Sequence, residues 1–90
     1  MTDHESTVRV DKWLWATRVF KTRTLAIESC KAGKVKVADL KAKPSREVAP
    51  GDIVTVRKDG MNKTLKVVAI AEKRVGAKTV AEYLKDLTPE

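Results

Sequence analysis

The sequence predicts a small α+β fold, in which two N-terminal helices pack on a small, mainly antiparallel sheet and a short helix follows near the C-terminus. Three observations predict this class. The apolar residues recur with a helical period up to Gly33 and then alternate, as in a half-buried strand. Two β-rich runs, "DIVTVRK" and "KTLKVVAIA", are separated by the turn signal "DGMN". Finally, "TVAE" has the spacing of a capping box and precedes apolar residues at helical spacing.

The segment "VRVDKWLWATRVF", residues 8–20, predicts the first helix. Asp11 suits its N-cap, and Val10 can pack against the first turn. The inner side of this helix holds Trp13, Ala16 and Phe20. We therefore expect Trp13 in the core. Trp15 falls towards the charged side, which leaves two interpretations open: a half-buried prop, or a surface on which an RNA base stacks.

A second helix is predicted after Lys21, with Thr22 as its N-cap. It ends at Gly33, because glycine readily takes the left-handed conformation found just beyond a helix. Its inner stripe consists of Leu25, Ala26, Ser29 and Cys30. The following strand, "KVKVA", has Val35 and Val37 on its buried face and Lys34 and Lys36 on its exposed face.

The remaining segments predict loops, a hairpin and a terminal helix. The stretch "ADLKAKPSREVAPGD" is irregular and ends in a turn at Pro50–Gly51. Thr79 and Glu82 form the capping box of the C-terminal helix. The apolar residues of that helix are Val80, Tyr83, Leu84 and Leu87.

A chain of 90 residues is long enough for one domain, and it contains no internal repeat or low-complexity linker. We divide it into a disordered N-terminal tail (1–8), one compact domain (9–71) and a C-terminal extension with the short helix (72–90).

The positive charge is concentrated in one half of the chain. The net charge is +7. Residues 9–46 hold eleven Lys and Arg against three acidic residues, whereas the rest of the chain has eight against nine. A charge run is usually a solvated face, but an excess confined to one half of a small domain indicates a surface for a polyanion.

Several classes of function are excluded by the residues present. The single cysteine, Cys30, allows no internal disulfide, and with one histidine, His4, the chain predicts no metal site, no cofactor and no catalytic Cys–His pair. We expect no enzyme activity. No apolar run is long enough to cross a membrane, and "MTDHESTV" lacks the cationic start of a signal peptide. The cytoplasm is the expected location.

Four short motifs in order resemble the S4 RNA-binding domain family. They are Arg9-Val10-Asp11-Lys12, Thr22-Arg23-Thr24, Gly33-Lys34-Val35 and Pro50-Gly51-Asp52. The resemblance spans residues 9–58 and implies the small fold of that family, sometimes called the αL motif. One difference is the strand turn "ADLK", around Asp39-Leu40, where the family usually has an Asn–Gly turn.

The resemblance implies that the helices and the strand after Gly33 present a basic surface to structured RNA. The implied RNA-contacting residues are Arg9, Lys12, Arg18, Lys21, Thr22, Arg23, Thr24, Lys31, Lys34, Lys36, Lys43, Ser45 and Arg46, with Trp15 as a stacking candidate. Within the family, "DKWLWATRVFKTR" is most similar to stand-alone bacterial members. That similarity implies binding to large-subunit ribosomal RNA, and to the tRNA of a stalled nascent chain, in a heat-shock or ribosome-rescue role.

Two other classes of function stay open. Two helices joined by a tight turn could act as a DNA-binding helix-turn-helix, and a basic surface binds DNA non-specifically in any case. Alternatively, Trp15, Val19 and Ile27 could form an exposed apolar patch for another protein. The sequence contains no dimerisation element, so we expect a monomer.

Overall fold

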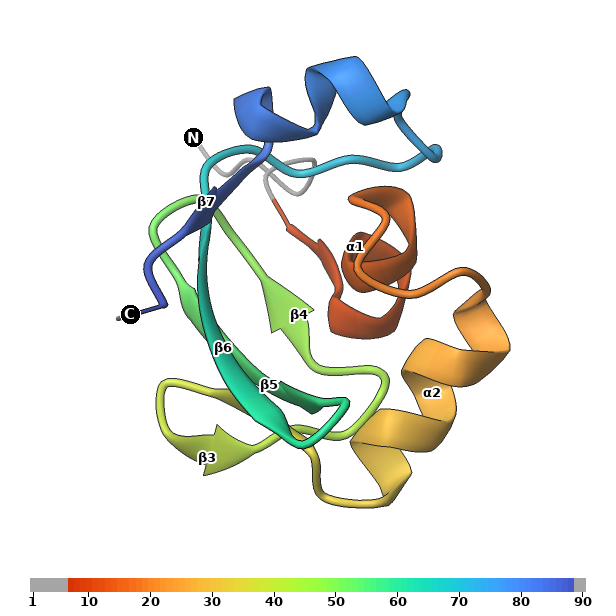
Figure 1. Cartoon of the computed structure of the whole chain (residues 1–90), viewed down its shortest axis with the longest axis vertical. Helices are drawn as coiled ribbons and strands as arrows, with labels where there is room; N and C mark the ends of the chain where they lie inside the picture. The colour runs from red at the N-terminus through yellow and green to blue at the C-terminus, as the bar shows by residue number, and fades with distance from the viewer. Residues whose placement is uncertain (1–6, 89–90) are drawn as a thin grey trace.

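The computed structural model describes residues 7–88, and its α+β architecture confirms the predicted class. The elements are β1 (Val8–Arg9), α1 (Val10–Ala16), α2 (Arg23–Lys31), β2 (Val35–Val37), β3 (Leu40–Lys41), β4 (Glu47–Val48), β5 (Ile53–Lys58), β6 (Met61–Val67), the 3-10 helix η2 (Ala77–Glu82) and β7 (Leu84–Asp86). Figure 1 shows α1 and α2 together on one side of the sheet, with the segment containing η2 above them.

The main sheet has five strands in the order β3-β2-β5-β6-β7, and every neighbouring pair is antiparallel. Strands β1 and β4 form a separate pair beside it. Two hairpins close with two-residue turns, Ala38-Asp39 between β2 and β3 and Asp59-Gly60 between β5 and β6. All four turn residues have positive φ, which is the type I′ geometry that matches the twist of the strands.

The core lies between the inner face of the sheet and the two helices. The inner face contributes Val35, Val37, Val54, Val56, Leu65 and Val67. Against them pack Trp13 and Leu14 of α1 and Ala26 and Cys30 of α2. Trp13 has no exposed surface, and its indole N–H donates to the carbonyl of Ala69 at 3.1 Å. The predicted core position of Trp13 is therefore confirmed.

The first helix is shorter than predicted and its N-cap prediction is wrong. It ends at Ala16 rather than Phe20, because Arg18 takes a left-handed φ of 66° that a helix cannot contain. Two carbonyl groups at its end are satisfied without a further turn: the Thr17 hydroxyl donates to the carbonyl of Trp13, and the Val19 N–H donates to that of Leu14. Arg9 occupies the N-cap position, and Asp11 lies inside the first turn.

The second helix matches its prediction at both ends. The Thr22 hydroxyl accepts a hydrogen bond from the Leu25 N–H at 3.1 Å, as an N-cap should, and Gly33 follows the helix with a φ of 77°. One member of the predicted inner stripe differs: Leu25 is 44% exposed. The helix is tilted so that Ala26 and Cys30, one turn apart, make the buried contacts.

The C-terminal segment forms a shorter helix and then a strand that the sequence did not predict. Helix η2 ends at Glu82, and the Thr79 hydroxyl donates to the Gly76 carbonyl instead of capping a longer helix. Leu84 starts β7, because residues 84–86 pair with the edge of β6 and gain backbone hydrogen bonds there. Residues 84–86 of the extension are thus part of the main sheet.

The N-terminal end of the fold also differs from the predicted boundary. Val8, which the sequence analysis places in a disordered tail, pairs with Val48 and is buried in the core. It belongs to the fold because strand β1 pairs with β4 and leads directly into α1. The rest of the predicted tail, apart from Thr7, lies outside the described residues.

Candidate nucleic-acid interface

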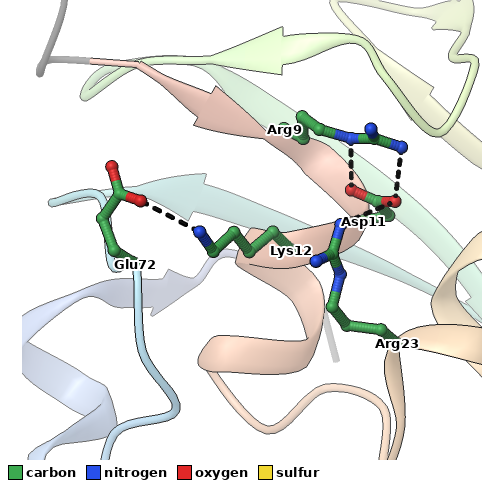
Figure 2. A network of polar contacts seen from close by, with 5 residues as sticks. All are labelled: Arg9, Asp11, Lys12, Arg23 and Glu72. Carbon is green, nitrogen blue, oxygen red and sulfur yellow. Dashed lines mark hydrogen bonds and ion pairs between the residues drawn. The ribbon is translucent and has the colours of Figure 1, made fainter.

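Arg9 and Arg23, from two of the motifs, meet at a single buried carboxylate, that of Asp11 (Figure 2). Arg9 donates from Nε to Oδ1 at 3.2 Å and from Nη2 to Oδ2 at 3.0 Å. Arg23 donates from Nη2 to the same Oδ2 at 3.4 Å. Asp11 thus ties the end of β1 and the start of α1 to the first residue of α2.

The burial of these three side chains is unequal. The Asp11 side chain has no exposed surface, whereas those of Arg9 and Arg23 are 48% and 40% exposed. A buried carboxylate needs charged or hydrogen-bonding partners, since an unpaired one would be strongly destabilising. Asp11 engages only Nη2 of Arg23, and among the described residues the Nε of the same guanidinium is buried without a hydrogen-bond partner. The arrangement fixes both arginines and leaves the cluster with one net positive charge.

Lys12 lies beside this cluster and is paired with an acid from the far end of the chain. Its Nζ is 3.0 Å from Oε1 of Glu72, which lies between β6 and η2 (Figure 2). The pair is partly exposed, and exposed ion pairs contribute little to stability. An anionic ligand can therefore compete with Glu72 for Lys12 at little cost.

The loop between β3 and β4 is attached to the start of α1 by its backbone. The Val10 N–H donates to the carbonyl of Arg46 at 2.7 Å, and the Asp11 N–H donates to that of Pro44 at 3.4 Å. These bonds hold three exposed side chains of the predicted set next to the start of α1. They are Lys43, Ser45 and Arg46.

The beginning of α2 offers hydroxyl groups and charge on its exposed side. Lys21, Thr22 and Thr24 are all exposed there. The free N–H groups of a helix start and its dipole favour an anion such as a phosphate. The RNA contact that the motif implies for this corner stays a prediction.

Two shallow hollows continue the basic surface past the end of α2. One, of about 460 Å³, includes Lys31 and Lys43 in its lining. The other, of about 280 Å³, is lined by Lys34 and Lys36. Gly33 and Lys41 line both hollows, so the two lie next to each other. Sequence reasoning missed Lys41; its position follows once Ala38-Asp39 is recognised as a two-residue turn, because that turn pairs Lys41 with Lys36.

Arg18 is not brought together with this surface. Its guanidinium donates to the carbonyl of Val75 at 3.1 Å, on the C-terminal segment. Trp15, the stacking candidate, is half-buried, and its carbonyl accepts a hydrogen bond from Arg74. Val19 also packs partly against the core, so the apolar patch that the sequence left open is partly covered.

No metal-binding arrangement occurs in the described part of the chain: residues 7–88 contain no cluster of three or more His, Cys, Asp or Glu side chains. Burial raises the pKa of the Cys30 thiol to about 11, and the charge of Asp11 acts in the same direction. That shift keeps the thiol protonated and unreactive at neutral pH. Among the same residues, no helix has the length and apolar content to span a bilayer.

A comparison with known protein families gives the class to which the chain belongs. The S4 domain family model matches residues 8–54, more than half of the chain, and the chain therefore belongs to the S4 domain family. This confirms the family that the sequence motifs indicate.

Individual proteins are also similar to this chain in sequence and structure. Heat shock protein 15 of Escherichia coli K12 is 43% identical over 74 residues, which cover 82% of this chain and 56% of that protein. The solved trimeric structure of Vibrio cholerae heat shock protein 15 is 39% identical, has a TM-score of 0.84, and is matched over 89% of this chain and 81% of its own. The RQC P-site tRNA stabilizing factor of Bacillus subtilis is 44% identical over 50 residues, 56% of this chain and 58% of that protein. The chain thus spans little more than half the length of these curated relatives.

Proposed function

We propose that the chain is a binding module, without catalytic activity, that holds structured RNA by its backbone. One observation carries this proposal: cationic and hydroxyl side chains, exposed or partly exposed, come from the start of α1, both ends of α2, the loop before β4 and strand β2. The Asp11 ion pairs, the backbone bonds of the loop and the two hollows link these segments. The members of this surface are Arg9, Lys12, Lys21, Thr22, Arg23, Thr24, Lys31, Lys34, Lys36, Lys43, Ser45 and Arg46.

The side-chain chemistry of this surface supports RNA as the partner. Folded RNA is recognised mainly by shape, through phosphate and 2′-hydroxyl contacts, because its deep major groove excludes side chains. Lysine and arginine suit phosphates, and the hydroxyls of Thr22, Thr24 and Ser45 suit both groups. A base-reading helix is not needed for this mode of binding.

The names of the relatives support a ribosomal target. One group is named for heat shock, and another for stabilising P-site tRNA. We propose that this chain acts in the cytoplasm on the large ribosomal subunit, binding its RNA and the tRNA of a stalled nascent chain during heat shock or ribosome rescue.

We also propose that the chain acts as a monomer, although the Vibrio cholerae relative was solved as a trimer. The exposed large hydrophobic residues of the described chain support this, since they lie in different segments: Leu25 in α2, Leu40 in β3, Met61 at the start of β6, and Val68 and Leu87 just after β6 and β7. Sedimentation equilibrium with and without RNA measures the state directly. A trimer mass without RNA would contradict the proposal.

Cosedimentation with ribosomal particles tests the target. The wild type should migrate with free large subunits more than with small subunits or translating ribosomes. The double variant Lys31→Ala/Lys43→Ala should migrate less with them. The control Lys73→Ala/Lys78→Ala removes two exposed charges from the C-terminal segment and should behave as wild type. Migration only with small subunits would reject the large-subunit target, and failure to bind any structured RNA would reject the function itself.

A further inference from the structure

We propose that the outer face of the five-stranded sheet is a second contact surface for the RNA backbone. It joins the surface proposed above, here called the helix surface, through Lys41. The inference rests on the proposed RNA binding and extends it to residues that the sequence motifs do not include. Lys41 and Arg57 are its central cations.

The outer face is defined by the alternation of the strands. In β5, Thr55 and Arg57 alternate with the buried Val54 and Val56, and in β2, Lys36 lies between two buried valines. Both helices cover the opposite face of the sheet (Figure 1). The side chains that the register places on the outer face are Lys36, Lys41, Ile53, Thr55, Arg57, Asn62, Thr64, Lys66 and Lys85. This set includes no acidic residue.

The cations of this face are placed against one another. Lys36 lies directly opposite Lys41 across the β2–β3 ladder, and Lys66 lies directly opposite Lys85 across the β6–β7 ladder. Like charges in such cross-strand positions repel and destabilise a sheet. None of these four lysines, nor Arg57, has an acidic partner within 4.0 Å in the described part of the chain. A bound polyanion would remove this repulsion.

The hollow on this face presents donors for a phosphate chain. Lys34, Lys36, Lys41 and Arg57 line it together with the Thr55 hydroxyl and the Asn62 amide. Cations next to neutral donors suit phosphate and 2′-hydroxyl groups in alternation. A lipid surface would be met by large apolar or aromatic side chains for insertion, and the outer-face set offers only Ile53.

The hollow also continues the helix surface rather than standing apart. Lys41 lines both hollows, and its aliphatic stem passes over Gly33, where a Cβ would lie 3.5 Å from its Cε. A backbone lying along Lys31 and Lys43 therefore meets Lys41 before it reaches Lys36 and Arg57. The geometry points to one RNA segment that crosses strand β3 onto the sheet.

The test compares two charge-matched variants by RNA affinity and stability. Lys41→Gln/Arg57→Gln keeps much of each side chain and removes two charges from the sheet face; Lys73→Gln/Lys78→Gln removes two from the segment that Figure 1 shows at the opposite end from β3. Binding of an RNA hairpin is measured against salt concentration. We expect the sheet variant to reduce the magnitude of the salt slope by about two, one for each phosphate contact, and the control to leave it unchanged.

Stability is measured on the same variants. We expect the sheet variant to unfold at the same or higher urea concentration than wild type in low salt, because it removes like charges that repel each other across the strands.

The outcomes separate the two proposals. If the wild type binds no RNA hairpin, both proposals fail. If it binds, and the sheet variant matches the control, the sheet surface is rejected and the helix surface stands. A loss of RNA affinity that merely follows a loss of stability would also reject it. Vesicles containing phosphatidylserine provide a third arm: binding to them that depends on Lys41 and Arg57, with RNA affinity unchanged, would assign the face to a lipid surface instead.

Discussion

At the scale of single residues, the buried carboxylate of Asp11 determines where two of the motif arginines point. It accepts three hydrogen bonds from Arg9 and Arg23 while having no exposed surface itself. The sequence predicted a helix cap at this position, because an aspartate before an apolar run usually is one. Its partners are Arg9, two residues before it, and Arg23, twelve residues after it, and a local pattern cannot reveal the more distant pairing.

The double variant Arg9→Ala/Arg23→Ala should lower the free energy of unfolding by about 3–5 kcal/mol, since it leaves a carboxylate buried without a cation. The control Lys21→Ala/Lys31→Ala removes the same number of charges from exposed positions and should change it by less than about 1 kcal/mol. Urea titration followed by circular dichroism measures both. Equal stability of the two variants would show that Asp11 does not depend on the arginines.

The two tryptophans of α1 should differ in what they contribute. Trp13→Ala removes a fully buried ring and should cost about 3–5 kcal/mol. Trp15→Ala removes a half-buried one, and should cost less stability but weaken RNA binding beyond the stability loss if the ring stacks on a base. Tryptophan fluorescence during RNA titration reports the stacking directly. Quenching that persists in the Trp15→Ala variant would rule out Trp15 as the stacking surface.

The raised pKa of the Cys30 thiol predicts that the free energy of unfolding changes with pH in alkaline solution. Burial raises the pKa of its thiol from 9.0 to about 11 in the folded chain. Between these pH values the unfolded chain has lost the proton that the folded chain keeps, so the free energy of unfolding falls as the pH rises. Urea titrations from pH 8 to pH 11 should show wild type losing more stability than Cys30→Ala across this window. If the free energies of unfolding of the two proteins changed in parallel with pH, the thiol would be exposed to water in the folded chain, which would contradict its burial.

At the scale of elements, the β2–β3 hairpin stores strain in its turn. Ala38 and Asp39 both have positive φ, a conformation that costs about 1–2 kcal/mol for an ordinary residue. The double variant Ala38→Asn/Asp39→Gly supplies the residues that a type I′ turn prefers and should stabilise the chain by about 1 kcal/mol. Thermal unfolding measures this. A lower melting temperature than wild type would mean that the native side chains make contacts that offset the strain.

The elements that the sequence predicted well have local signals. Thr22 and Gly33 bound α2, the alternation of valine and lysine gives β2, and Asp59-Gly60 closes the β5–β6 hairpin. The elements it missed depend on distant partners. Leu84 follows a helical spacing, but it pairs with the open edge of β6 as part of β7. Helix α1 ends early at Ala16, two residues before Arg18, whose guanidinium donates to the carbonyl of Val75.

At the scale of the whole molecule, the charge pattern along the chain and the charge pattern in space differ. The sequence concentrates the basic excess in residues 9–46, and the helix surface follows from that with the family motifs. Strand pairing then adds Arg57, Lys66 and Lys85 to the same sheet face as Lys36. Composition could not show this, because register and not sequence distance decides which side chains share a face.

The salt dependence of RNA binding is the most direct test of a basic surface that holds the RNA backbone. Neutralising about 4–6 phosphates predicts that log K falls with log salt concentration with a slope of about −3 to −5. Lys31→Ala/Lys43→Ala should weaken binding and reduce the magnitude of that slope by about two, whereas Lys73→Ala/Lys78→Ala should not. A slope near zero for the wild type, or the same slope for all three proteins, would contradict binding through this surface.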